Sequence, residues 1–73
     1  MNNFTIDSIE SLKEFFTFVV MNQHDKRTRM TCFVNAKIRR EWLLNHETFC
    51  CEGRFHTLEF VDMKGGVWEV KIW

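Results

Sequence analysis

Six side chains in this 73-residue chain are of the kinds that bind transition metals or act as nucleophiles: His24, Cys32, His46, Cys50, Cys51 and His56. Structural zinc sites usually hold two pairs of ligands, and the members of a pair are about two to four residues apart. His46 and Cys50, one helical turn apart, most closely resemble such a pair, whereas the adjacent Cys50 and Cys51 do not fit a zinc knuckle. We therefore predict no metal site and no cofactor.

The three cysteines also indicate the cellular compartment in which the protein is expected to function. An odd number of cysteines does not form a closed set of disulfides, and free thiols are typical of a reducing compartment. Cys32 is expected to be a small buried side chain. No secretion signal is visible, and the longest apolar run, 15–21, is shorter than the roughly 20 residues of a membrane-spanning helix. We predict a cytoplasmic protein.

Catalytic side chains lack the sequence context that catalysis requires. A cysteine nucleophile needs a neighbouring base and an oxyanion-binding turn, and no strand-to-helix elbow or glycine-rich turn supplies one. Glu59 and Glu69 are expected on a hairpin surface, where water does not differentiate two carboxylates into an acid and a base. Gly65 and Gly66 mark a turn, since the lysine and hydroxyl residue of a phosphate-binding loop do not follow them. We predict that the chain is not an enzyme.

Basic residues are concentrated in the middle of the chain. Between residues 21 and 45, six basic against two acidic residues leave a local charge of +4, although the whole chain has a net charge of zero. Such a segment could meet phosphates or an acidic protein surface, with Phe33 and Trp42 as stacking groups if they are exposed. The remaining alternative is a solvated surface whose cations pair with acidic residues of the same chain. The predicted partner-binding residues are Lys26, Arg27, Arg29, Lys37, Arg39, Arg40 and Trp42.

These features favour a binding function. Zero net charge gives no long-range attraction to nucleic acid or to an anionic membrane, so a protein partner is favoured over nucleic acid and no membrane binding is predicted. We predict a small non-enzymatic protein that occludes a site on a larger macromolecule, in the manner of inhibitors made by phages and mobile elements. That association rests on size and type alone, because no motif carries it. The alternative is a small RNA- or DNA-binding protein that uses the basic middle segment.

The segment 7–22 is the element around which the fold is expected to form. On a helix, its apolar residues occupy one arc of about 140°: Ile9, Leu12, Phe15, Phe16, Val19 and Val20. Asp7 and Glu10 predict a capping box at its start. Phe18 and Met21 project from the main arc, which predicts either burial all round the C-terminal half or a second contact.

The middle of the chain predicts one strand and a second helix. Apolar residues alternate with others over 28–36, as in a strand buried on one face. On a helix over 37–49, Ile38, Trp42, His46 and Phe49 form a stripe, and Asn35 can cap it. Leu43 and Leu44 fall off that stripe. Residues 50–53 are then expected to turn the chain.

The C-terminal segments 54–62 and 66–73 predict a β-hairpin. One register places Glu59 opposite Glu69, a destabilising pair, and a slip of two residues instead places Glu59 opposite Lys71. Both registers direct the same apolar residues inward: Leu58, Phe60, Trp68, Val70 and Ile72. The opposite face holds Phe55, Val61, Val67 and Trp73, and we predict that the second helix or another chain, such as a second copy, covers it.

Together these elements predict a single α+β domain over residues 1–73. Its N-terminal helix packs on a small antiparallel sheet of three or four strands that includes the C-terminal hairpin, and a short second helix joins them. Its composition, 45% hydrophobic and 15% aromatic without proline, is typical of an ordered globule.

Overall fold

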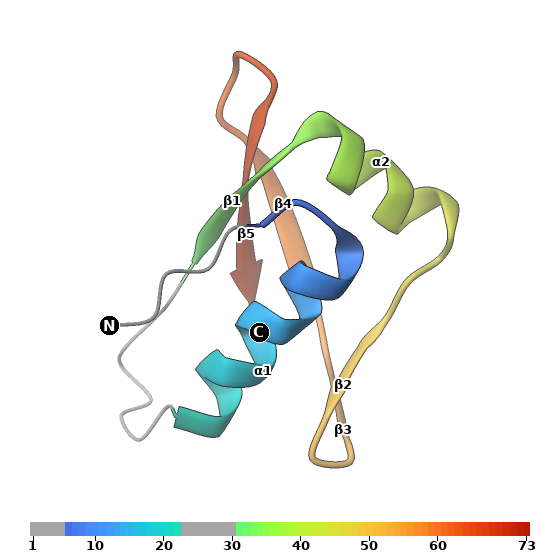
Figure 1. The fold of residues 1–73 in the computed structure, drawn as a ribbon, viewed down its shortest axis with the longest axis vertical. Coiled ribbons are helices and arrows are strands. Elements are labelled where there is room, and N and C mark those ends of the chain that lie inside the picture. The colour runs from blue at the N-terminus through green and yellow to red at the C-terminus, as the bar shows by residue number, and fades with distance from the viewer. Residues whose placement is uncertain (1–5, 23–30) are drawn as a thin grey trace.

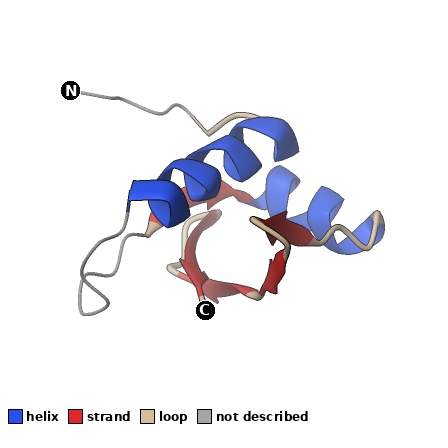
Figure 2. Cartoon of the chain, turned by 90° about the horizontal axis from the view of Figure 1, so that it is seen from below, coloured by secondary structure: helices blue, strands red, loops and turns tan. Residues whose placement is uncertain are grey.

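A computed structural model describes residues 6–22 and 31–73 and confirms the predicted α+β class. The elements, in chain order, are α1 (Ile9–Asn22), β1 (Cys32–Asn35), α2 (Ala36–Leu44), β2 (Phe49–Cys51), β3 (Arg54–His56), β4 (Leu58–Asp62) and β5 (Val67–Ile72). β1, β5 and β4 form an antiparallel sheet with β5 in the centre, while β2 and β3 form a separate antiparallel hairpin. Both helices lie over the same side of the curved strand layer (Figure 1, Figure 2). No helix in the described part of the chain is long and apolar enough to span a membrane.

The N-terminus of α1 is capped by two serines. The backbone N–H of Ser11 donates to Ser8 Oγ at 3.1 Å, and the backbone N–H of Ser8 donates to Ser11 Oγ at 3.0 Å. The predicted capping box of Asp7 and Glu10 is therefore wrong by one residue. A serine hydroxyl can accept a hydrogen bond from a backbone N–H, as a carboxylate can, so Ser8 and Ser11 form the reciprocal pair of a capping box.

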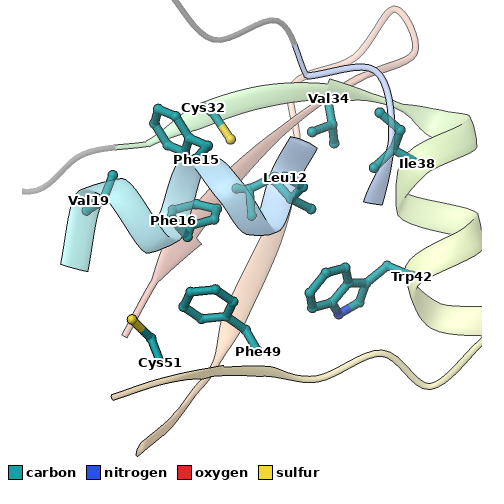
Figure 3. Packing of buried hydrophobic residues seen from close by; sticks show 11 residues of the cluster. Leu12, Phe15, Phe16, Val19, Cys32, Val34, Ile38, Trp42, Phe49 and Cys51 are labelled. Atoms are coloured by element: carbon teal, nitrogen blue, oxygen red, sulfur yellow. The ribbon is translucent and has the colours of Figure 1, made fainter. Parts of the chain in front are cut away.

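The core lies between α1, α2 and the strand layer (Figure 3). α1 contributes its predicted apolar arc, with four residues buried and with Ile9 and Val20 packed at the edge. Phe18 is half-buried and Met21 is exposed, so the predicted burial all round the C-terminal half of this helix is wrong. The buried apolar residues are Leu12, Phe15, Phe16, Val19, Cys32, Val34, Ile38, Trp42, Phe49, Cys51 and Val70.

α2 ends five residues before the predicted boundary at residue 49. Its start follows the prediction, since Asn35 Oδ1 accepts the Ile38 N–H at 2.9 Å. Its end is fixed by a Schellman motif: the Glu47 N–H donates to the Trp42 carbonyl, the His46 N–H donates to the Leu43 carbonyl, and His46 has a φ of 51°. The predicted stripe therefore breaks at His46, which is exposed.

Residues 49–51 form a strand, where the prediction had the end of a helix and a turn. Glu52 and Gly53 join β2 to β3, and both have positive φ angles, 54° and 76°. Two positive φ values are the mark of a type I′ turn, whose twist matches that of the strands it joins. The turn is thus two residues long, and Cys50 and Cys51 belong to the hairpin ladder.

The C-terminal hairpin adopts the register that avoids the pair of glutamates. Glu59 lies opposite Lys71, and Glu69 lies opposite Val61. The predicted strand 54–62 changes partners at Thr57, where it leaves β2 and joins β5. The predicted inner face of the hairpin is confirmed. Its residues all lie in the core or pack against it: Leu58, Phe60, Trp68, Val70 and Ile72.

Replacing Phe16 with alanine should lower the free energy of unfolding by about 3 to 5 kcal/mol. Phe16 is fully buried, and a chain of this size has only a few kcal/mol of stability to lose. Met21→Ala on the same helix removes an exposed side chain and should change stability by less than about 0.5 kcal/mol. Urea unfolding followed by far-UV circular dichroism measures both. Similar values for the two variants would contradict the assigned core.

Candidate partner-binding surface on the second helix

Two of the predicted partner-binding residues lie on the solvent side of α2. Lys37 and Arg40 are exposed, one helical turn apart, and the sequence places Leu43 and Leu44 on the same side one turn further on. These two leucines are 50% and 69% exposed. We call this set of four residues, Lys37, Arg40, Leu43 and Leu44, the α2 outer face.

Two other predicted partner-binding residues, Trp42 and Arg39, pack against the rest of the chain and do not face solvent freely. Trp42 is 6% exposed and points from α2 into the core near Leu12 and Phe49 (Figure 3), so it offers no free ring for stacking. The Arg39 guanidinium carbon lies 4.0 Å from the centre of the Trp68 ring, a cation–π distance, and Arg39 is half-buried there. Lys26, Arg27 and Arg29 lie outside the described residues.

The α2 outer face carries positive charge that the described chain does not neutralise. Within residues 6–22 and 31–73, neither Lys37 nor Arg40 lies within ion-pair distance of an acidic side chain. The ion pair found there joins Lys13 Nζ of α1 to Glu47 Oε1 at 2.8 Å, and Lys13 also lies 5.7 Å from the Trp42 ring centre. This contact holds the end of α2 against α1 and leaves the cations of the outer face to solvent.

Backbone interactions at both ends fix the direction in which the α2 outer face points. The Asn35 cap ties the start of α2 to the end of β1, and the Schellman motif at His46 turns the chain back toward β2. Between these ends, Ile38 and Trp42 anchor the opposite side of the helix in the core. A partner would therefore meet a preformed surface and would have little of it to order on binding.

The leucines were not among the residues predicted from sequence. The available signal was that Leu43 and Leu44 do not fit the apolar stripe of their own helix. A leucine that misses the core-facing stripe must either face solvent or be covered by something else. Charge and aromatic character alone do not identify these two leucines.

The candidate metal ligands are dispersed in the structure. His24 lies outside the described residues, and in residues 6–22 and 31–73 no three His, Cys, Asp or Glu side chains come together as a metal would require. Cys32 and Cys51 are buried, whereas Cys50 is exposed. Burial raises the pKa of the Cys32 thiol to about 12, so this sulfur stays protonated and unreactive near neutral pH.

The remaining candidates for acid–base chemistry are Glu59, Glu69 and His56, and each contacts different neighbours. Glu59 Oε1 accepts a hydrogen bond from Trp73 Nε1 at 3.0 Å, whereas Glu69 lies between Val61 and Phe33 on the neighbouring strands. His56 packs against the Phe49 ring, and its Nδ1 lies 3.3 Å from the Trp73 carbonyl.

No family model, curated protein or solved structure matches this chain.

Arg39 and Arg40 are adjacent in sequence but should differ in their effect on stability. Arg39→Ala removes the cation–π contact and the packing of the arginine stem on Trp68, and should cost about 1 kcal/mol of unfolding free energy. Arg40→Ala changes an exposed side chain and should cost less than about 0.5 kcal/mol. Chemical denaturation compares the two, and an equal effect would contradict the different positions assigned to them.

Proposed function

We propose that this chain is a non-enzymatic binding protein that occludes a site on a larger protein, and that the α2 outer face is its contact surface. The observation that carries the proposal is the exposure of Leu43 and Leu44 directly beside Lys37 and Arg40, two cations with no ion-pair partner among residues 6–22 and 31–73. Apolar side chains at the centre of a contact with charged residues at its rim are the usual composition of a protein–protein interface.

The two kinds of residue have different roles in this proposal. Covering apolar surface is worth about 25 cal/mol per Å², so Leu43 and Leu44 supply affinity when a partner removes them from water. Lys37 and Arg40 contribute orientation and the rate of encounter, because exposed charges act mainly through steering. The expected site on the partner is an apolar depression with acidic residues at its edge.

A protein partner suits this surface better than a nucleic acid does. Phosphate groups would pair with Lys37 and Arg40 but would bury neither leucine in an apolar contact. The aromatic ring that stacking on α2 would need belongs to Trp42, which lies in the core. The RNA- or DNA-binding alternative retains one supporting observation, the 55% exposed ring of Phe33 on β1.

The small size of the chain supports occlusion as the mode of action. A rigid helix face on a 73-residue chain can cover a site without enclosing a substrate, and this is how small phage-type inhibitors are expected to act. We place the protein in the cytoplasm, where the exposed thiol of Cys50 would remain reduced.

Arg40→Glu combined with Leu44→Asp should abolish partner capture without unfolding the chain, since both residues are exposed. Tagged protein should retain a stoichiometric protein partner from nuclease-treated extract of its own cells, and the double variant should lose it. With that partner purified, the dissociation constant should rise at least about 100-fold, the effect of losing a central contact. Circular dichroism and thermal melting check that the fold is kept.

The matched control is Arg54→Glu with Met21→Asp, which makes the same changes of type at exposed positions on β3 and α1. This control should bind as the wild type does. Undiminished capture by the α2 double variant would remove the α2 outer face from the proposal. Capture that disappears with nuclease, together with steep salt dependence of binding to RNA or DNA, would establish the nucleic-acid alternative instead.

A further inference from the structure

Besides the α2 outer face, the protein has a second surface of interest, on the side of the sheet away from both helices (Figure 2). Neither helix covers the predicted outer hairpin face, because both lie over the opposite side of the strands. Phe33 and Trp73 are each 55% exposed on this side, and Val67 is also exposed. We call this surface the outer sheet face; the residues that define it are Phe33 of β1, Glu59 of β4, and Val67, Glu69, Lys71 and Trp73 in and after β5.

The central strand of this face has a self-complementary sequence. Its outward residues are Val67, Glu69, Lys71 and Trp73, which read apolar, acidic, basic, apolar along the strand. The reversed order has the same pattern with the two charges exchanged. A second β5 running antiparallel across this face would therefore set each charge opposite its counterion and each apolar end opposite an apolar end.

We propose that the outer sheet face binds a second copy of this chain, forming a two-fold symmetric dimer. The two-fold axis lies between the copies at the level of residue 70 and runs across the strands. It places Glu69 of each copy against Lys71 of the other, and Val67 against Trp73. Sheets packed face to face are about 10 Å apart, a distance that a glutamate and a lysine side chain together can bridge.

The charge order also selects this arrangement over the other symmetric one. A two-fold axis parallel to β5 would set Glu69 on Glu69 and Lys71 on Lys71, and each of these like pairs would oppose association. The crossed arrangement converts both into opposite-charge pairs. Within each copy, Glu59 lies beside Lys71 and accepts the Trp73 indole hydrogen bond, so the positions of these side chains are already constrained before association.

A stable dimer would have to cover only a modest part of the surface of this chain. A standard interface buries about 800 Å² on each partner, roughly a seventh of the 5469 Å² accessible surface of this chain. The outer sheet face spans the three strands β1, β5 and β4. The α2 outer face belongs to the helix layer, so it remains accessible in such a dimer and this inference does not depend on the proposed function.

Charge reversal at two positions tests the arrangement. In Glu69→Lys alone, and in Lys71→Glu alone, both intersubunit pairs become repulsive, and each variant should dissociate at least about tenfold more readily than the wild type. An equimolar mixture of the two variants has attractive pairs only. Sedimentation velocity over a series from low to high micromolar concentration should show dimers in the wild type and in the mixture, and monomers in each variant alone.

Several outcomes would overturn the proposal. A wild type that stays monomeric throughout the series would exclude the dimer, and dimers that survive both single variants would place the contact on another surface. Weakened variants that fail to recover on mixing would exclude the antiparallel arrangement. Thermal melting checks the fold of each variant; if a charge reversal unfolds the chain, Val67→Lys at an exposed position of the same strand gives the same readout of dimer loss.

Discussion

The packing of α1 against two separate pieces of β-structure is the constraint on which the rest of the fold depends. Phe16 is fully buried, and its ring meets Phe15 of the same helix at 5.0 Å and Phe49 of the β2–β3 hairpin at 6.3 Å, both edge to face. A two-stranded hairpin is marginal in water by itself, and no third strand pairs with this one in the described structure. It is held by Phe49 and Cys51, whose side chains are buried in the core that α1 covers.

The same core determines how the candidate surface is presented. Trp42 joins α2 to the core and to the Phe60 ring, while Lys13 of α1 reaches Glu47 just beyond the end of α2. With one side of α2 anchored in this way, the charged and apolar residues of its other side must face solvent. The position of the α2 outer face is therefore a consequence of core packing, and the site needs no separate scaffold.

Sequence periodicity predicted the elements that bury one clear face. The apolar arc of α1, the alternation over residues 32–35 and the inner face of the hairpin follow from a period of 3.6 or 2, and the structure has each of them. Of the rest of the predicted strand 28–36, residues 28–30 lie outside the described residues and Ala36 is the first residue of α2. The sequence left two hairpin registers open, and the structure adopts the one that places Glu59 opposite Lys71 and avoids the destabilising pair of Glu59 and Glu69.

Features set by local backbone conformation could not be read from periodicity. The end of α2 depends on His46 adopting a left-handed conformation, which its residue type permits but does not require. The short strand β2 depends on the type I′ turn at Glu52 and Gly53 and on the burial of Phe49, a contact with a helix more than thirty residues away in the chain. For the candidate surface, charge indicated Lys37 and Arg40, but the core position of Trp42 and the stacking of Arg39 on Trp68 required the three-dimensional structure.

Native-state hydrogen exchange tests most directly whether α1 unites the two β-structures into one core. If it does, the hydrogen-bonded amides of the β2–β3 hairpin and those of β5 should exchange through the same cooperative opening, with free energies that agree within about 1 kcal/mol. Exchange of the hairpin amides through an opening several kcal/mol less costly, while β5 remains protected, would contradict the central place given to the contact between Phe16 and Phe49.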